Sequence, residues 1–440
     1  MENPNPGAAE REAMWKLAER LFPIFRSICG PGVKRVLEAI GGEIPLRIRE
    51  YPTGLECGSW TVPREWEPLE AYLETLDGRR ILDWRDNGLH LWLFSRPFEG
   101  VVKRDELLKH VHTRPELPDA VPVRVTFYQE NWGFCMSERM KQSLGEEEYR
   151  VVIRTRLFDG AFRIGEAVLP GDLSEEIVLD SYICHPLLAN DNQSGVVVAV
   201  ELFKMLARLP RRRYTYRLVL CPETVGPAVY LHQDPELRKR IAGGYTFVSV
   251  GDGGAFHYRS SYHGDSVADR AIAHALKHCG IAGTVEPYDV RSGTTGNEKG
   301  YNAPGFSVPV GSLRRSHIGA YPEHCTSFDN LDFIRPEALM ETLRLAWMAV
   351  QALERTIVYR PLFTGEPFLT RYGLFPHGKS KEERFAWDYL KGFTDGRNSL
   401  IDIADKGGLF VADLDAAVSG FLEKGLIEEA RGPAVARGGR

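Results

Sequence analysis

The chain has 440 residues, which corresponds to about three domains at roughly 150 residues each. Hydrophobic residues make up 43% of it and charged residues 26%, a composition that excludes a mostly disordered or fibrous protein. Fifty-five Lys and Arg against 60 Asp and Glu leave a net charge of -5, so the chain has no overall basic field to hold nucleic acid or an anionic membrane. We therefore expect neither as a partner.

The targeting and redox signals point to the cytoplasm. Residues 1–30 are polar and then amphipathic, without the apolar core of a signal peptide. No window approaches the roughly 18 apolar residues that a membrane span needs. The seven cysteines are odd in number and scattered, with no CxxC pair, which favours free thiols over a disulfide framework.

The first 160 residues are predicted to change from helix to strand. Residues 10–28 and 33–40 repeat apolar positions at helical spacing, with a Gly-Pro-Gly break between them. From about residue 56 to 160, short β-like runs at 60–62, 89–94 and 123–128 alternate with turn residues and are rich in Trp. We interpret this part as an inserted β-rich subdomain.

Residues 176–310 alternate between strand and helix. Strands are predicted at 177–182, 216–220 and 245–250, and helices at 195–209 and 269–278. This alternation predicts an α/β fold with a mostly parallel sheet flanked by helices.

The C-terminal part predicts helices at 383–390, 400–404 and 411–422 and a strand at 425–427, the size and order of a winged helix. The predicted domains are therefore an N-terminal helical part (1–55), the β-rich insertion (56–160), an α/β catalytic domain (161–361) and a winged-helix domain (362–440).

Four polar residues fall where the strands of such a sheet end. His185 and Asp191 follow the first predicted strand, Glu223 the second and Asp252 the third. Ligands bind at this edge of an open parallel sheet, and a catalytic zinc needs three or more N, O or S ligands and one open position. Each residue also has a simpler interpretation: Asp191 as a helix cap, His185 as a packed side chain, and Glu223 and Asp252 as turn residues.

Three motifs carry a resemblance to a known family: Cys184–Gly195 (CHPLLANDNQSG), Pro222–Gly226 (PETVG) and Glu323–Asn330 (EHCTSFDN). They resemble the zinc aminopeptidases of the M28 class, and more closely a bacterial aminopeptidase-like branch (DUF4910) with an inserted DUF2172 domain and a C-terminal winged helix. Residues 60–66 and 132–135 look like that inserted domain. The resemblance implies a zinc exopeptidase-like fold.

The resemblance also implies a metal site that is altered in this chain. One metal would be held by His185, Asp191 and Asp252, and Glu223 would be the general base. At the remaining ligand positions of the second metal, this chain has Thr224 and Cys325. Thr is a poor zinc ligand, whereas the Cys325 thiolate is a good zinc ligand and has His324 as its neighbour in the sequence. A single zinc on His185, Asp191 and Asp252 is the favoured arrangement. Recruitment of Cys325 or His324 into a one-zinc or two-zinc site, and a metal-free site, are the alternatives.

Substrate contacts are predicted in a polar loop and an arginine pair. Asn297, Glu298 and Lys299 match an Asp-Glu-Arg run of the relatives, so Glu298 and Lys299 are expected to contact substrate, unless the loop is simply solvated. Arg314, followed by Arg315, would bind a substrate carboxylate or phosphate, or would be an exposed pair.

The sequence thus predicts a zinc-dependent hydrolase that cleaves an amide bond with Glu223 as base on a metal-bound water. Its substrate would be a short peptide, as in an aminopeptidase, or an acylated small metabolite or amino sugar, as in a deacylase. The alternatives are a metal-free, degenerate peptidase-fold binding protein and a winged-helix regulator. Residues 411–422 contain two Asp and no Lys or Arg, so DNA reading is disfavoured. The sequence leaves the oligomeric state open, a homodimer being the commonest assembly.

Overall fold

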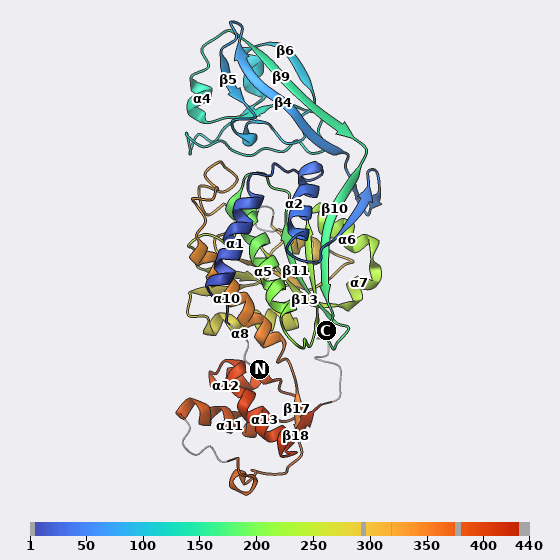
Figure 1. The fold of residues 1–440 in the computed structure, drawn as a ribbon, viewed down its shortest axis with the longest axis vertical. Helices are drawn as coiled ribbons and strands as arrows, with labels where there is room; N and C mark the ends of the chain where they lie inside the picture. Colours follow the sequence, from blue (N-terminus) through green and yellow to red (C-terminus); the bar gives the residue numbers. More distant parts are fainter. Residues whose placement is uncertain (1–4, 292–295, 318, 375–379, 431–440) are drawn as a thin grey trace.

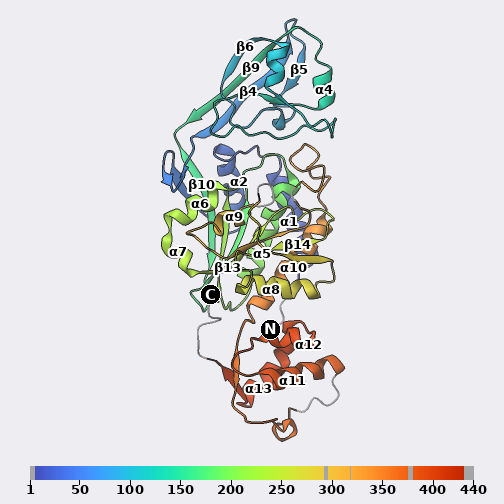
Figure 2. The ribbon, with the colours of Figure 1, turned by 180° about the vertical axis from the view of Figure 1, so that it is seen from behind.

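The computed structural model describes residues 5–291, 296–317, 319–374 and 380–430. The molecule is elongated, with a β-rich part at one end, an α/β body in the middle and a helical part at the other end (Figure 1). The view from behind in Figure 2 shows the same three parts in line. No helix in the described ranges combines the length and the apolar run that crossing a bilayer requires.

The body is built on an eight-stranded sheet. Its spatial order is β1 (Arg47–Pro52), β10 (Ala161–Leu169), β12 (Thr215–Cys221), β11 (Glu176–Tyr182), β13 (Ile241–Phe247), β16 (Val310–Arg314), β14 (Phe256–Arg259) and β15 (Gly283–Glu286). Strand pairs β12–β11, β11–β13, β13–β16 and β14–β15 are parallel, and the other three are antiparallel. The predicted α/β class, with a mostly parallel sheet flanked by helices, is confirmed.

Helices cover both faces of this sheet, which explains why its central strands β11 and β12 are almost entirely buried. The helices of the body are α1 (Ala8–Leu21), α2 (Pro31–Gly41), α5 (Gly195–Ala207), α6 (Val225–Gln233), α7 (Pro235–Arg240), α8 (Val267–His278), α9 (Glu298–Tyr301) and α10 (Pro336–Leu353). Strand β11 shows the arrangement. It directs Ile177 and Leu179 into the core under α1, α5, α8 and α10, and Val178 into the core beside α6 and α9. All seven of its residues are buried, as expected for a parallel strand with both faces covered.

The β-rich part contains a second sheet of four antiparallel strands in the order β5 (Arg80–Asp83), β4 (Glu65–Thr75), β9 (Glu148–Phe158) and β6 (Phe98–Lys103). Smaller elements accompany it: β2 (Glu56–Cys57), β3 (Trp60–Thr61), β7 (Val111–His112), β8 (Phe134–Cys135), α3 (Arg104–Lys109) and α4 (Glu138–Gln142). The predicted strands at 89–94 and 123–128 are wrong. Both runs are irregular, with left-handed backbone at Phe94 (φ 65°) and Phe127 (φ 51°). Residues 91–94 are all buried, and an apolar run without alternation does not by itself define a strand.

Within its described residues, the C-terminal part has three α-helices, α11 (Lys381–Phe393), α12 (Leu400–Gly407) and α13 (Asp415–Glu423), and a small antiparallel sheet of β17 (Tyr359–Pro361) and β18 (Ile427–Glu429). Its assignment as a winged helix remains a prediction. Its acidic side chains bind the body: Arg270 pairs with Asp402 at 2.6 Å, and His274 with Asp405 at 2.7 Å. Both carboxylates lie on α12, so this helix is engaged in docking against the body.

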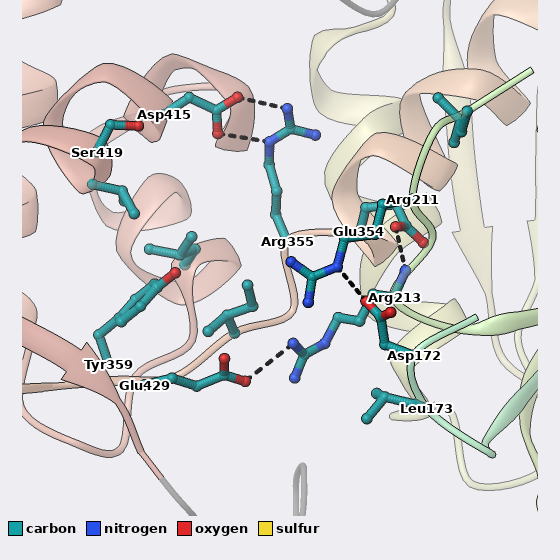
Figure 3. Close-up of a pocket in the computed structure, with 14 residues that line it drawn as sticks. Asp172, Leu173, Arg211, Arg213, Glu354, Arg355, Tyr359, Asp415, Ser419 and Glu429 are labelled. Atoms are coloured by element: carbon teal, nitrogen blue, oxygen red, sulfur yellow. Dashed lines mark hydrogen bonds and ion pairs between the residues drawn. The ribbon is translucent and has the colours of Figure 1, made fainter. Parts of the chain in front are cut away.

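A cavity of about 480 Å³ lies in this docking seam (Figure 3). Its charged side chains pair across or beside it: Arg355 binds both carboxylate oxygens of Asp415 at 2.8 and 2.6 Å, and Arg213 binds Glu429 at 3.1 Å. The seam therefore joins the C-terminal part to the body through opposite charges.

Candidate metal centre

Three side chains with metal-binding atoms converge at the carboxyl ends of the central strands. The Oδ2 of Asp191 lies 3.3 Å from Nε2 of His324 and 3.7 Å from Sγ of Cys325, and Sγ lies 3.6 Å from the same Nε2. All three are largely shielded from solvent. We call this group the Asp191 centre.

The spacing of the Asp191 centre fits a tetrahedral zinc. With Zn–O and Zn–N bonds of about 2.0–2.1 Å and Zn–S of about 2.3 Å, tetrahedral angles place an O and an N ligand about 3.3 Å apart, and S about 3.5–3.6 Å from either. The three separations in the structure match these values within about 0.2 Å. A carboxylate, an imidazole and a thiolate are also donors that zinc accepts. The residues present therefore fit the metal.

Asp191 is placed by its neighbours in the segment that precedes α5. The side-chain nitrogen of Asn192 donates to Ser181 Oγ at 2.9 Å and to the Phe247 carbonyl at 2.8 Å. The side-chain oxygen of Asn192 accepts from the Ser249 N–H at 3.0 Å. The carboxylate of Asp191 is thereby fixed beside Tyr182, whose hydroxyl donates to it. Asp191 does not cap α5, because the residue at the N-cap position is Ser194. The helix-cap interpretation is wrong.

Asp329 holds the backbone of residues 190–191 through hydrogen bonds. Its two oxygens accept the N–H groups of Asn190 at 2.5 Å and of Asp191 at 2.9 Å. Burial and the nearby charge of Asp191 raise the pKa of Asp329 to about 7, although the two backbone bonds act in the opposite direction. Asp329 thus holds the backbone on which the Asp191 carboxylate is mounted.

Glu223 and His185 lie together at the same edge. Glu223 follows β12, and its Oε2 is 3.7 Å from Nε2 of His185, which follows β11. Burial, reinforced by the negative charges of Asp191 and Glu298, raises the pKa of Glu223 to about 8. Burial lowers the pKa of His185 below its ordinary value, against the attraction of Asp191. Without a metal, the pair at neutral pH is therefore a neutral imidazole beside a largely protonated carboxyl group.

A buried amide anchors the loop that carries Glu223. The oxygen of Asn297 accepts the Thr224 N–H at 3.0 Å, and its nitrogen donates to Asp180 at 3.0 Å. Thr224 has a left-handed backbone (φ 64°), a conformation that a non-glycine residue adopts only when its surroundings impose it. Asn297 supplies one such constraint.

Asp252 is not part of the Asp191 centre. Its Oδ2 accepts from the Asn190 amide at 2.8 Å, and its Oδ1 accepts from the Gly254 N–H at 2.6 Å and from Ser316 Oγ at 2.8 Å. Three donors therefore already occupy its carboxylate. Among the described residues, the Asp191 centre brings Asp191 together with His324 and Cys325, rather than with His185 and Asp252. The role of Asp252 as a ligand stays a prediction.

The predicted substrate residues have different environments. Glu298 and Arg314 are both buried, and they form an ion pair with each other at 3.1 Å. Arg314 also donates to Ser312 at 2.9 Å, whereas Lys299 on α9 is exposed. Arg315 is buried and binds Glu341 at 2.7 Å, so the interpretation as an exposed arginine pair is wrong.

Several supporting residues were not predicted. Tyr182, Asp180, Asn190 and Asp329 all bind within or around the site. Asp180 and Tyr182 follow the apolar run Ile177–Leu179 in a fully buried strand, and a polar residue in such a strand is the signal that could have identified them. Asn190 and Asp329 lie within the quoted motifs, but their roles depend on bonds between distant segments.

Comparison with known proteins agrees with this architecture. The DUF4910 family, described as a domain of unknown function, matches residues 15–356. A Clostridium acetobutylicum protein, named for polysaccharide biosynthesis and an aminopeptidase-like domain, is 35% identical over 401 residues, 90% of this chain and 91% of that protein.

Two solved structures share the fold. A candidate peptidase from Clostridium acetobutylicum superposes with a TM-score of 0.89 at 33% identity, covering 96% of this chain and 97% of that one. A zinc aminopeptidase from Bacillus subtilis gives a TM-score of 0.58 at 14% identity, covering 80% and 96%, a likeness of fold alone. The chain therefore belongs to the DUF4910 family and has an aminopeptidase-like fold, which supports a peptidase-like hydrolase.

Proposed function

We propose that the protein is a zinc-dependent hydrolase that cleaves an amide bond, with zinc held by Asp191, His324 and Cys325. The observation that carries this proposal is the tetrahedral spacing of the three donor atoms. The proposal departs from the arrangement favoured by the sequence, in which His185, Asp191 and Asp252 hold the metal.

When bound, zinc supplies a Lewis acid that polarises the scissile carbonyl and lowers the pKa of water toward 7. The proton released by the attacking water requires an acceptor that can pass it to the leaving amine. Glu223 is the proposed acceptor, because it lies at the same sheet edge as the Asp191 centre, and the positive charge of a bound zinc would favour its ionised form, which can take up a proton. His185, at 3.7 Å from that carboxylate, orients it.

The proposed substrate is an acylated amine on a small molecule such as an amino sugar. The two-zinc aminopeptidase pattern has a carboxylate where this chain has Thr224, so the usual arrangement for holding a free N-terminal amine is altered. The C. acetobutylicum relative is named for polysaccharide biosynthesis, which agrees with a sugar substrate. Short peptides with a free N-terminus are the competing class.

Metal analysis of tag-free protein tests the ligand assignment. We expect zinc at the Asp191 centre to be lost in Cys325→Ala and His324→Ala and kept in Cys279→Ala, a partly exposed cysteine outside the site. Protein that holds no zinc after reconstitution, or Cys325→Ala protein that keeps the same zinc content and affinity as the wild type, would refute the assignment.

An activity panel tests the reaction and substrate. Zinc-loaded protein should release acetate from N-acetylated amino sugars faster than it releases amine from aminoacyl amides, and a chelator should stop both reactions. Hydrolysis that survives complete removal of zinc would contradict a metal-dependent mechanism, and faster cleavage of the aminoacyl amides would favour the peptide class.

A further inference from the structure

A second group of metal-binding side chains lies at the far edge of the central sheet, separate from the Asp191 centre. Nδ1 of His257 and Nε2 of His317 both approach Oε1 of Glu286, at 3.1 and 3.2 Å. The two imidazole rings are 4.1 Å apart between centroids and tilted by 40°. We call these three residues the edge cluster.

The register of the sheet explains why they meet. In the parallel pair β14–β15, His257 lies opposite Thr284 and Arg259 opposite Glu286. Residues two apart on a strand share a face, so these four side chains lie on one face of the edge strands. His317 joins them from the turn that follows β16, the strand paired with β14 on its other side. The geometry of the backbone therefore presents the cluster, and it does not depend on one mobile side chain.

The donor set suits a divalent transition metal. Two imidazoles and one carboxylate are a ligand combination found in zinc sites, and zinc places N and O ligands about 3.3 Å apart. The separations of 3.1 and 3.2 Å are close to this value. All three side chains are partly exposed, at 23%, 25% and 41% for His257, Glu286 and His317, so an ion from solvent can reach them.

The two oxygens of the Glu286 carboxylate face different groups. Arg259 lies 3.6 Å from Oε2, while both imidazoles face Oε1. The guanidinium orients the carboxylate, as partners of ligating groups do in metal sites, and its positive charge lowers the affinity for a cation. Such a site is expected to bind more weakly than the buried Asp191 centre.

A third group in the described structure shows what a non-binding cluster looks like. His274, His278 and Asp405 also lie close together. Both ring nitrogens of His274 are already occupied, however, one by Asp405 at 2.7 Å and the other by the Val411 N–H at 3.0 Å. This histidine serves docking of the C-terminal part and has no nitrogen left for a metal. In the edge cluster, Nδ1 of His257 also lies 3.0 Å from Thr284 Oγ1, and a metal bound at this nitrogen would replace that one bond.

We propose that His257, Glu286 and His317 form a second, surface-accessible binding site for a divalent transition metal such as zinc. Bound metal would clamp β14, β15 and the turn after β16 together. That turn also contains Ser316, which donates to Asp252 at 2.8 Å. A metal in the edge cluster would therefore stabilise the turn that contacts Asp252. The proposal is independent of the proposed hydrolase function.

Zinc titration in a Cys325→Ala background tests the site, because that background removes a ligand of the Asp191 centre. Tag-free protein is titrated with zinc chloride against a chromophoric chelator, with magnesium chloride as the negative control. We expect about one zinc per chain in the background protein, and at least a tenfold loss of affinity on adding His317→Ala or Glu286→Gln. The control is His263→Ala, which removes an exposed histidine outside the cluster.

Thermal unfolding provides the second measurement. Zinc should raise the unfolding temperature of the background protein and of His263→Ala, and should raise it less in His317→Ala. His317 is the most exposed of the three ligands, so its replacement is the variant most compatible with folding, and Glu286→Gln preserves shape if it fails. Equal zinc affinity and equal thermal shifts in all variants would overturn the proposal, even if the Asp191 centre binds zinc as proposed.

Discussion

Replacing Asn297 with Ala should destabilise the body of the protein and loosen the loop of Glu223. The Asn297 side chain is fully buried and bonds to the Thr224 N–H and to the Asp180 carboxylate, each at 3.0 Å. Leaving a buried polar group without its partner costs about 1–3 kcal/mol. Two such groups place the loss of unfolding free energy at about 2–6 kcal/mol, with the lower half expected because a water molecule can enter the space.

The Asn297→Asp variant adds a pH dependence whose sign is fixed. It keeps the oxygen that accepts from Thr224 but turns a carboxylate toward Asp180, whose pKa burial raises from 3.8 to about 7. The folded variant then binds protons that the unfolded chain releases at lower pH. Its stability relative to the wild type should therefore fall as the pH rises from about 4 to 7.

Scanning calorimetry measures both effects. A loss of about 2–4 kcal/mol corresponds to a decrease of about 4–15 °C in the unfolding temperature of a body of this size. Asn398→Ala, at a partly exposed site whose side-chain bonds face solvent, is the control and should change it far less. An Asn297→Ala protein that unfolds within 1 °C of the wild type, or an Asn297→Asp protein without pH dependence, would show that the bonds of Asn297 do not anchor this loop.

Three further predictions concern catalysis and docking. Glu223→Gln should keep its zinc and lose about 10²–10⁴-fold in turnover, as measured by metal analysis and initial rates; unchanged turnover would remove Glu223 from the role of base. Arg355→Ala should lower the unfolding temperature of the C-terminal part slightly, because it removes two charged bonds to Asp415; the carboxylate is 44% exposed, so the pair contributes about 1 kcal/mol, and an unchanged transition would mean that it contributes nothing. Although burial opposes the shift, His274 and Lys277 lower the pKa of Asp405 to about 2, so its contribution to docking is present above pH 3.8 and is lost as the pH falls toward 2. Pepsin cleavage between the two parts should increase over that range more in the wild type than in Asp405→Asn.

The alternation of apolar runs and helical periods was enough to predict the α/β class. Every residue of β11 is buried, so the pattern of this strand reflects burial on both faces and is visible without a structure. The same reasoning failed at residues 89–94, where a continuous apolar run is buried in irregular backbone with a left-handed turn at Phe94. An apolar run in the sequence indicates that a segment is buried, but it does not indicate whether the backbone of that segment is a strand or irregular.

The candidate site was predictable in its location and only partly in its membership. Strand ends meet at one edge of a parallel sheet, which identified the neighbourhood of Asp191 and Glu223 from sequence position alone. Which donor atoms share one ion depends on distances of a few tenths of an ångström between remote segments. Tertiary structure placed His324 and Cys325 against Asp191 and surrounded Asp252 with three hydrogen-bond donors.

Sequence by itself thus determined which residues are buried in periodic elements and which chemical groups stand at the ends of strands, because both follow from local order along the chain. Only the tertiary structure decided which of those groups meet. The edge cluster shows the same division: His257, Glu286 and His317 lie on separate elements up to 60 residues apart in sequence, and the register of three neighbouring strands brings their nitrogen and oxygen atoms within about 3 Å of one another.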